Sequence, residues 1–594
     1  MSNIQYGQYD VPPAEQLVKF NVGQPSPKIL DLNVLQTGLN FVSQITNSSL
    51  LQYGDIPGYN QFRECFADFL TKQYNEKVNA SELFMTNGVT QSLTLICSLF
   101  LHKGSTIFVE EPTYFLALNI FKELGLNIVS IPIEQDGINL EMLEEKIKCE
   151  VLNHNSSQKI ALYTIPTFHN PTSYTMSHEK RTKLAEFTKK YSLLVLADEV
   201  YQMLYFNDDS KPPLPLCYYG ENIISIGSFS KTLAPAMRMG WMQIKNKTMM
   251  DKFLKCGQYD SSGGSSPITQ ALIHGIISSG NLAKNIANSK KFLSENCKFM
   301  SNYIAEKLEN YVEFVEPKGG YFLWLKTKNI KVEDLMKYSE NFKIMLAPGW
   351  RFSATEDCRK YIRLSFSYYD FDGIKLGVER LYELFKYVEE NIKINVAILG
   401  HKGKLGSKIV SALEKQKDMK FIEGIDRNFD MQNIDKYSVI IDVSRPEGTK
   451  VLLEKLIAKQ CKIPVIIGTT GDLPLDLIEK YKQYANIKVT SNFSLGIPQV
   501  LKFIEKFDTD KWNIGMTEEH HIHKVDKPSG TALTLQKILG KEVLIESVRE
   551  GEIIGTHILT FDREDEQIVI KHVAKNRDLF ANGALEYCRC VMNE

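Results

Sequence analysis

The sequence lacks any hydrophobic run long enough to span a membrane, and its first residues show no basic stretch followed by an apolar one. It also lacks an excess of either charge, because 70 Lys and Arg residues stand against 71 Asp and Glu residues, a formal net charge of -1. This balance gives no electrostatic reason to expect nucleic acid or an anionic membrane as a partner. We therefore expect no secretion signal, no membrane span and partners that are small molecules.

Paired cysteines are lacking as well. The ten cysteines are scattered and no C-x-x-C pair recurs, which is typical of reduced thiols in a cytoplasmic protein and not of a disulfide framework. Cys588 and Cys590 lie close together on a helical pattern without His or Cys partners nearby, so we interpret them as packing residues. No internal repeat or low-complexity segment is visible.

The chain is long. Its 594 residues are too many for a single hydrophobic core and indicate roughly three to four folding units. Up to about residue 390, helical patterns alternate with apolar runs at 105–109, 160–165, 193–197 and 223–226. This alternation predicts an α/β sheet with covered faces. A closing amphipathic helix is predicted at 373–393, and a new buried strand at 394–399. We predict domains at 1–393, 394–491 and 492–594.

A lysine flanked by hydroxyls and an arginine marks the first candidate site. Lys231 follows an apolar run, with Ser228 and Ser230 just before it and Arg238 just after. A lone lysine after serines is usually a solvated surface residue. Here, however, two hydroxyls and a guanidinium supply phosphate donors beside a nucleophilic amine.

Three segments upstream support this site. Asp198 ends a predicted strand, where a carboxylate can keep a pyridine nitrogen protonated. Asn170 also follows a strand end, and its amide can hydrogen-bond a ring hydroxyl. Gly88 precedes a helical run, and the free N–H groups at a helix N-terminus bind phosphate.

In this order the motifs resemble the fold-type I, class I aminotransferases that use pyridoxal 5'-phosphate, over residues 12–388, and the subgroup with aminoadipate and aromatic substrates fits best. The resemblance implies a large and a small α/β domain, and Lys231 as the residue that forms the Schiff base and moves the substrate Cα proton. Tyr53 would reach the phosphate of the partner subunit. Arg363 would clamp the substrate α-carboxylate bidentately, near Gly23. The implied cofactor-binding residues are Gly88, Val89, Thr90, Tyr114, Asn170, Asp198, Tyr201, Ser228, Ser230 and Arg238.

A glycine turn after the strand at 394–399 marks the second candidate site. Gly400, Gly403 and Gly406 allow tight turning and close approach of a pyrophosphate to a helix N-terminus. About twenty residues on, a predicted strand ends at Asp426 and Arg427. A carboxylate there suits the ribose 2'-hydroxyl of NAD, and an adjacent arginine can accept a 2'-phosphate. Further parallel strands are predicted at 438–443 and 462–467.

The stretch 518–532 contains three histidines and two lysines within eight residues, followed by a Pro-Ser-Gly-Thr turn into a helix. With 468–471, 491–496, 549–557 and 580–584, it resembles 4-hydroxy-tetrahydrodipicolinate (dihydrodipicolinate) reductase from residue 394 onward. The resemblance implies a Rossmann half, an α+β substrate and oligomerisation half, and NADPH or NADH as cofactor.

The reductase resemblance also implies roles for individual residues. His520 and Lys524 match the catalytic acid pair. The cyclic dicarboxylate would be bound by His521, Lys524, Gly530 and Thr531, the last two at a helix N-terminus. The implied nucleotide-binding residues are Gly400, Gly403, Lys404, Leu405, Gly406, Asp426, Arg427, Gly468, Thr469, Thr470, Ser491, Asn492 and Phe493.

Two interpretations of this cluster compete with the reductase site. His520, His521 and His523 could bind a metal, but no Cys or carboxylate partner is obvious, so we predict no metal site. The stretch could also be a series of solvated charged residues, but this interpretation leaves the turn at 528–531 unexplained. His401 and Lys402 depart from the small or apolar residues usual in the family's glycine loop, and Lys404-Leu405 stands where Arg-Met is common. These departures leave the choice between NADH and NADPH open.

Three hypotheses describe how the two halves of the chain function together. In the first, a bifunctional enzyme of the diaminopimelate route to lysine makes tetrahydrodipicolinate and transaminates that product or a derivative. In the second, transamination of lysine, aminoadipate or an aromatic amino acid is coupled to reduction of a cyclic imine. In the third, the N-terminal half is a regulatory module, which the lack of room for a preceding DNA-binding segment disfavours. The resemblances imply a homo-oligomer, with a dimer through the aminotransferase half and a tetramer as a further state.

Overall fold

A computed structural model describes residues 11–153, 159–391, 393–416, 418–426, 434–490 and 492–593. Two site residues predicted from the sequence, Arg427 and Ser491, lie outside these ranges. The chain forms two compact units that divide between Val388 and Glu389, close to the boundary predicted near Lys393. Each unit has sheets and buried cores of its own.

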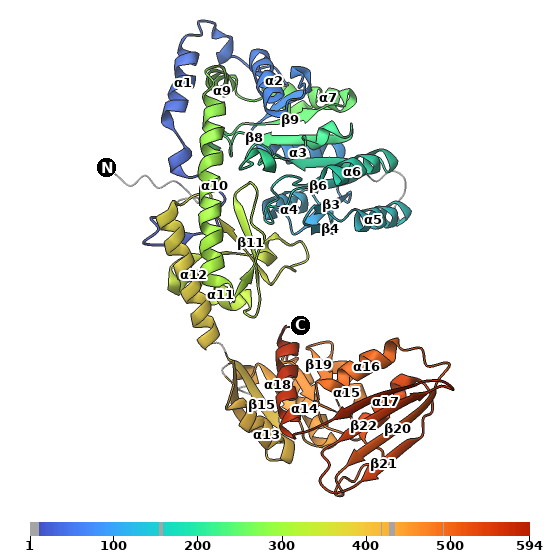
Figure 1. Ribbon diagram of the computed structural model, residues 1–594. Coiled ribbons are helices and arrows are strands. Elements are labelled where there is room, and N and C mark those ends of the chain that lie inside the picture. Colours follow the sequence, from blue (N-terminus) through green and yellow to red (C-terminus); the bar gives the residue numbers. More distant parts are fainter. Residues whose placement is uncertain are drawn as a thin grey trace. The chain divides into compact units, whose positions relative to one another are not determined.

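Within the described residues, the first unit contains an eight-stranded sheet in the order β2-β9-β8-β7-β6-β3-β4-β5 (Figure 1). The neighbours from β8 to β4 pair in parallel, whereas β9 is antiparallel to β8 and β2, and β5 is antiparallel to β4. The four strands predicted from apolar runs are present as β3, β6, β7 and β8. The bounds are β2 Leu83–Thr86, β3 Thr106–Glu111, β4 Asn127–Glu134, β5 Gly137–Ile138, β6 Ile160–Thr164, β7 Leu194–Asp198, β8 Ile223–Ser228 and β9 Gly240–Ile244.

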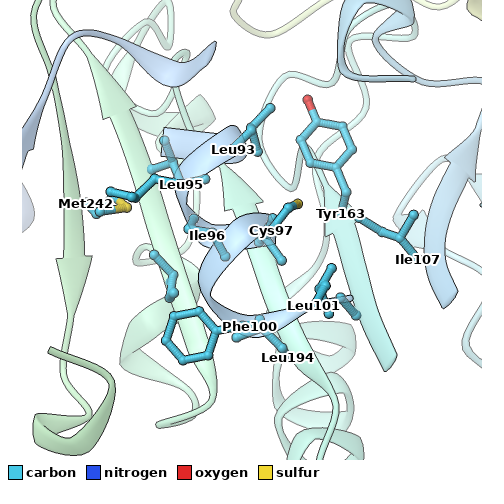
Figure 2. Packing of buried hydrophobic residues seen from close by; sticks show 14 of the residues in the cluster. Leu93, Leu95, Ile96, Cys97, Phe100, Leu101, Ile107, Tyr163, Leu194 and Met242 are labelled. Atoms are coloured by element: carbon cyan, nitrogen blue, oxygen red, sulfur yellow. The ribbon is translucent and has the colours of Figure 1, made fainter. Parts of the chain in front are cut away.

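Helices cover both faces of this sheet because successive strand residues enter opposite cores. Ile107 and Leu194 belong to one core, and Phe108 and Val195 to the other. Figure 2 shows the first core, where apolar side chains of α3 pack over Tyr163 and Leu194 of the central strands. The helices of the first core are α3 Val89–Phe100, α4 Phe115–Glu123 and α7 Lys247–Leu254, and those of the second are α5 Leu140–Asn153 and α6 His178–Lys190.

A smaller antiparallel sheet in the order β10-β11-β14-β13 completes the first unit. The long helix α10 runs beside both sheets, and α12 closes the unit at the helix predicted for 373–393 (Figure 1). The remaining elements are α1 Leu32–Ser43, α2 Asn60–Tyr74, α8 Gly257–Ser262, α9 Pro267–Ser278, α10 Asn281–Leu308, α11 Val332–Tyr338, α12 Phe371–Asn391, β1 Val18–Lys19, β10 Val312–Glu313, β11 Phe322–Thr327, β12 Ile344–Met345, β13 Ala347–Pro348 and β14 Tyr361–Ser365.

The second unit begins with a parallel sheet in the order β16-β15-β17-β18-β19. Its first strand, β15, occupies the predicted residues Ile394–Leu399, and the order reverses beside it, as in a Rossmann fold. One face packs against α13 and α18, and the other against α14 and α15. The bounds are β16 Met419–Ile425, β17 Val439–Asp442, β18 Val465–Ile467, β19 Ile487–Val489, α13 Lys404–Leu413, α14 Pro446–Ala458 and α15 Leu475–Tyr481.

A mixed sheet in the order β21-β20-β22-β23 forms the α+β half of the second unit. Helix α18 follows this sheet in sequence but returns to pack on the parallel sheet. Gly583 of α18 lies so close to the Phe493 carbonyl that a Cβ atom would overlap it. The bounds are α16 Gly496–Lys506, β20 Asn513–His520, α17 Gly530–Leu539, β21 Ile545–Arg549, β22 Thr556–Asp562, β23 Gln567–Val573 and α18 Asp578–Asn593.

No helix among the described residues is long and apolar enough to cross a membrane. All ten cysteines are free thiols. Cys588 packs in the core of the parallel sheet, as predicted, whereas Cys590 is exposed, so its interpretation as a packing residue was wrong.

Candidate active sites

Lys231 lies in the loop after β8, at the carboxyl end of the large parallel sheet, where ligands bind in open α/β folds. Its Nζ donates a hydrogen bond of 2.5 Å to the carbonyl of Gly23 and lies 5.3 Å from the centre of the Tyr321 ring. Burial, with repulsion from Arg363, lowers the pKa of Lys231 to about 8, against the attraction of Asp198. A lysine with this pKa has an appreciable neutral fraction near physiological pH and can act as a nucleophile.

Asp198 ends β7 and is 4% exposed. Its Oδ2 accepts a hydrogen bond of 2.9 Å from the Tyr163 hydroxyl, whereas its buried Oδ1 has no hydrogen-bond partner among the described residues. Burial raises the pKa of Asp198 to about 6. A buried carboxylate with one unsatisfied oxygen, set near a lysine, fits the protonated nitrogen of a pyridine ring.

Arg363 and Asn170, which lie far apart in the sequence, meet in the site. Arg363, 3% exposed, donates 2.9 Å to Asn170 Oδ1 and 2.6 Å to the Asn21 carbonyl, while its buried Nε has no partner among the described residues. The guanidinium lies 4.0 Å from the centre of the Phe322 ring, and a Cβ at Gly23 would come within 2.7 Å of that ring. A buried, oriented guanidinium with a free donor fits a substrate carboxylate.

The predicted phosphate residues converge at the start of α3. Gly88 is the N-cap of this helix, with φ of 92°, and a Cβ there would lie 3.3 Å from Arg238 Nη2. Ser228 pairs with Gly240, whose backbone lies against Gly88, and Ser228 Oγ accepts a hydrogen bond of 3.1 Å from the Ser230 N–H. Val89 and Thr90 form the first turn of the helix. The arrangement has the free helix N–H groups and the cation that a phosphate group requires.

Three tyrosines were predicted to contact the cofactor. Tyr201 is buried, with its ring 5.4 Å from that of Tyr321, the aromatic neighbour of Lys231. Tyr114 is the N-cap of α4, and its ring lies 5.5 Å from that of Phe115. Tyr53 is 82% exposed, so its side chain is available to another subunit.

One buried pair near this site was not predicted. Glu110 accepts hydrogen bonds from the Thr164 hydroxyl and the Ile165 N–H, and its Oε2 lies 3.2 Å from His169 Nε2. His169 precedes Asn170, so the pair holds the loop that carries the Asn170 amide. The sequence feature that could have identified this pair was the position of Glu110 directly after the predicted strand 105–109.

In the second unit, two of the three glycines of the turn after β15, Gly400 and Gly406, are needed for steric reasons. Gly400 has φ of 88°, and a Cβ there would lie 2.6 Å from the Val443 carbonyl oxygen. A Cβ at Gly406 would overlap the Gly400 carbonyl, and Gly403 is the N-cap of α13. Lys404 and Leu405 open that helix. A tight turn onto a helix N-terminus that excludes Cβ atoms fits a dinucleotide pyrophosphate.

The adjacent strand ends complete the nucleotide crevice. Asp426 follows β16, as predicted. The departure at His401 has a local reason, because its imidazole lies over Gly424, where a Cβ would overlap the ring. The buried carboxylate of Asp442, at the end of β17, was not predicted as a site residue. It accepts hydrogen bonds from the Ser444 N–H and hydroxyl and from the Thr449 and Thr469 hydroxyls.

The predicted nicotinamide residues connect the two halves of the second unit. Gly468 and Thr469 follow β18, and a Cβ at Gly468 would lie 2.3 Å from the Phe493 ring. Asn492 donates a hydrogen bond of 3.0 Å from Nδ2 to Thr531 Oγ1, the second residue of α17. Thr470 is the next residue in the same loop. The residues predicted for the nucleotide thus lie beside those predicted for the substrate.

Lys524 already holds a carboxylate in this structure, that of Asp526. Lys524 Nζ lies 2.7 and 2.8 Å from the two carboxylate oxygens. Burial raises the pKa of Asp526, but hydrogen bonds from Lys524 and the Gly530 N–H outweigh it, so the pKa is lowered overall. The contacts show that these predicted substrate-binding groups can bind a carboxylate.

His520 ends β20 beside a buried acidic partner, Glu518. The Glu518 side chain is fully buried and accepts hydrogen bonds from the Ser529 N–H (3.0 Å) and Arg549 Nη2 (2.8 Å). Its other oxygen lies 3.3 Å from His520 Nδ1. Burial lowers the pKa of His520 to about 4 although Glu518 raises it, and hydrogen bonds outweigh burial to lower the pKa of Glu518 to about 2. The sequence analysis did not identify Glu518 or Arg549.

A third side chain, His557 of β22, completes a possible set of metal ligands. One ligand atom from each of Glu518, His520 and His557 lies within 4.8 Å of the others. The sequence analysis missed this set because it found no carboxylate partner for the histidines. The carboxylate is paired with Arg549, however, and Arg549 and Lys524 both lower the pKa of His520 by repulsion. This positive surrounding favours an anionic ligand over a cation.

The charge of Arg577, a residue that the sequence analysis also missed, acts on His521. Burial, followed by repulsion from Arg577, lowers the pKa of His521. Arg577 directly precedes α18, and the signal that could have identified it was its position just before the stretch 580–584. The predicted dicarboxylate residues His521, Lys524, Gly530 and Thr531 are therefore accompanied by one further guanidinium.

Comparisons with known proteins agree with this arrangement. The family profile described as "Aminotransferase class I and II" matches residues 15–381, and those described as "Dihydrodipicolinate reductase", N-terminus and C-terminus, match 394–493 and 496–594. Aromatic-amino-acid aminotransferase 1 of Thermococcus litoralis is 28% identical over 365 residues, 61% of this chain and 87% of that protein. The 2-aminoadipate transaminase of Thermus thermophilus is 26% identical over 371 residues, 61% and 89%.

Among solved structures, the kynurenine aminotransferase of Pyrococcus horikoshii has a TM-score of 0.58 and 28% identity, covering 63% of this chain and 92% of its own. From residue 394 onward the chain has the N- and C-terminal domains of the dihydrodipicolinate reductases, which indicate an NAD(P)H-dependent reductase. The chain as a whole belongs to the class I and II aminotransferases, which use pyridoxal 5'-phosphate.

Proposed function

We propose that the two activities act in sequence in the diaminopimelate route to lysine. The reductase half reduces 4-hydroxy-tetrahydrodipicolinate to tetrahydrodipicolinate, with the 4-hydroxyl lost as water, and the aminotransferase half transfers an amino group to this product, its ring-opened keto form or an acylated derivative. The observation that carries the proposal is the carboxylate-binding group of Lys524 and Gly530 beside His520. A cyclic dicarboxylate needs such donors, whereas a monocarboxylate imine would leave part of them unused.

In the aminotransferase site, each residue has one proposed task. Bound pyridoxal 5'-phosphate supplies a ring that withdraws electrons from the substrate α-carbon. Asp198 keeps the ring nitrogen protonated, and Asn170 and Tyr201 hold the ring hydroxyl. Arg363 orients the substrate through its α-carboxylate, with Gly23 leaving room beside it. Lys231 accepts the proton of the substrate α-carbon and delivers it to the aldehyde carbon of the cofactor.

The remaining aminotransferase residues position the cofactor. Tyr114 covers the ring face, and the phosphate is held by Gly88, Val89, Thr90, Ser228, Ser230 and Arg238. We further propose a dimer in which Tyr53 reaches the phosphate of the partner subunit. The exposure of Tyr53 supports this, together with the exposed side chain of Leu51 two residues before it, 77% exposed.

In the reductase site, bound NAD(P)H supplies the hydride. We propose that Gly400, Gly403, Lys404, Leu405, Gly406 and Asp426 hold the dinucleotide, with Gly468, Thr469, Thr470, Asn492 and Phe493 around the nicotinamide. Arg427 and Ser491 keep their predicted nucleotide-binding roles as proposals without structural description. His521, Lys524, Gly530 and Thr531 bind the two carboxylates. His520 and Lys524 deliver the proton that accompanies the hydride.

The first experiment measures oxidation of NADPH and NADH by the full chain with freshly made 4-hydroxy-tetrahydrodipicolinate. We expect oxidation that is lost in His520→Ala and Lys524→Ala and kept in His523→Ala, an exposed histidine of the same loop. The reaction mixture is then given glutamate and pyridoxal 5'-phosphate, and formation of 2-oxoglutarate is measured against Lys231→Ala. Reduction without any transamination of the product or its acylated forms would contradict the joint pathway.

A second candidate rests on the similarity to the 2-aminoadipate and aromatic-amino-acid aminotransferases. In this alternative, the aminotransferase half converts lysine, 2-aminoadipate or an aromatic amino acid, and the reductase half reduces a cyclic imine formed from the oxo acid. Nicotinamide oxidation that requires lysine and both Lys231 and His520 would favour it. Transamination of tetrahydrodipicolinate derivatives at a higher kcat/KM than 2-aminoadipate would exclude it.

A further inference from the structure

The fully buried Glu518 has a geometry that connects the parts of the reductase site. Its Oε1 accepts from the Ser529 N–H and Arg549 Nη2, and its Oε2 lies 3.3 Å from His520 Nδ1. Neither atom has an aligned hydrogen bond, with the other or with any further described residue, so both are available to pair with each other. We propose that Glu518 is a positioning residue of the reductase, which fixes the ring and tautomer of His520 so that Nε2 exchanges the proton with the substrate.

The tautomer follows from the charge state of the carboxylate. Two donors, one of them a guanidinium, hold Glu518 ionised, and an ionised carboxylate only accepts hydrogen bonds. The imidazole nitrogen that faces it must then carry a hydrogen, which places the lone pair of neutral His520 on Nε2. This nitrogen lies on the side of Gly555, where a Cβ would come within 3.2 Å of it. The glycine leaves this nitrogen the room that a side chain would take.

Glu518 also joins His520 to the groups that bind the substrate carboxylates. Ser529 is the N-cap of α17, whose first two residues are Gly530 and Thr531. Arg549, the other partner of Glu518, donates to the main-chain carbonyls of Lys524 and Asp526. One carboxylate thus holds the proton-transfer residue, the helix N-terminus and the Lys524 loop in a single arrangement. Productive geometry requires that these parts stay within about half an ångström of their places.

The charge of Glu518 has a separate, measurable effect. Burial lowers the pKa of His520, and the attraction of Glu518 raises it. Because neutral His520 carries its hydrogen on Nδ1, it must take up a proton at Nε2, from Lys524 or water, before it can deliver one to the substrate. The carboxylate stabilises the imidazolium formed in this way. Removal of this charge therefore shifts the ionisation of His520 to lower pH. A residue that only supported the fold would not produce this shift.

Glu518→Gln tests the proposal in the full chain. The amide keeps an acceptor for Ser529 and Arg549 but presents an N–H to Nδ1, which forces the opposite tautomer. We expect kcat with 4-hydroxy-tetrahydrodipicolinate to fall on the order of a hundredfold or more, as when the orienting carboxylate of a catalytic histidine is neutralised. KM should stay within about threefold, because the carboxylate-binding groups remain. The acidic inflection of kcat/KM should move to lower pH.

Glu519→Gln is the matched control, since Glu519 is the next residue of β20 and its side chain points to the opposite face. Its kinetics should resemble those of the unchanged protein. Equal kinetics in Glu518→Gln and Glu519→Gln would overturn the proposal. A fall in kcat with an unshifted inflection would also overturn it, because that result assigns Glu518 a structural role alone.

A spectroscopic measurement keeps the proposal testable without turnover. Long-range proton–nitrogen spectra of histidine-labelled protein distinguish the two tautomers, and His520→Ala assigns the signal. We expect Nδ1–H in the unchanged protein and in Glu518→Asp, which keeps the charge, and Nε2–H in Glu518→Gln. The same tautomer in all three proteins would contradict the proposal. Failure of the diaminopimelate hypothesis would look different. The unchanged protein would not turn over 4-hydroxy-tetrahydrodipicolinate, but its His520 would still carry Nδ1–H and would change tautomer in Glu518→Gln.

Discussion

At the residue scale, Lys231 is a reactive amine in a buried site, and burial disfavours its charged form. The fold lowers its pKa from the ordinary value of 10.5 to about 8. A lowered lysine pKa means that the unfolded chain binds more protons between pH 8 and 10.5, so stability rises with pH across that window. Below pH 8 the folded protein contains a charged amine that is stabilised by Asp198 and the Gly23 carbonyl.

The lowered pKa predicts how the cofactor is captured. Only the neutral amine attacks an aldehyde, and at pH 7 roughly a tenth of Lys231 is neutral. We expect the rate of pyridoxal 5'-phosphate attachment to cofactor-free protein, followed by its absorbance, to rise with pH and level off above about 8. Lys231→Ala should show no attachment. A rate that continues to rise to the ordinary lysine pKa, near 10.4, would contradict this account of the burial.

At the element scale, much of the fold could be predicted because buried parallel strands read as continuous apolar runs. The strand at 394–399 and the helix starting at Gly530 are present at the predicted positions. The Glu518 cluster could not be predicted, because Glu518 and His557 become neighbours only through the register of β20 with β22. A single sequence does not show which residues pair across neighbouring strands. Helix α18 was likewise assigned to the substrate half, although it packs on the nucleotide sheet.

The loop before α17 presents its own carboxylate to the groups proposed for the substrate. Asp526 forms an ion pair with Lys524, so a dicarboxylate that binds Lys524 must displace it. Asp526→Asn removes the negative charge that competes for these donors. We expect the full chain with Asp526→Asn to bind pyridine-2,6-dicarboxylate, a planar analogue of the ring, several-fold more tightly by calorimetry, which corresponds to roughly 1 kcal/mol.

Asp510→Asn serves as the control for this prediction, because Asp510 forms an exposed ion pair with Lys541 at 3.7 Å, outside the predicted site. It should leave the affinity unchanged. Equal or weaker binding by Asp526→Asn would show that Asp526 holds Lys524 in place for the substrate and does not compete with it.

At the scale of the whole molecule, the chain contains two separately built cores. The clusters of buried apolar residues around the large sheet come from the first unit, and those around the parallel sheet from the second. Each unit also contains the residues proposed for one cofactor. A protein with this organisation need not unfold in one cooperative step. A ligand that binds one folded unit stabilises that unit by mass action.

Separate cores and separate cofactors predict a selective response to ligand removal. We expect two thermal transitions in calorimetry, one raised by pyridoxal 5'-phosphate and the other by NADPH. Each ligand at a hundred times its Kd should add about 2.7 kcal/mol to the unit that binds it. Lys231→Ala should reduce the first shift and leave the second, since it removes one covalent attachment and no nucleotide contact. A single transition raised by either ligand would instead show that the two catalytic units fold and unfold as one.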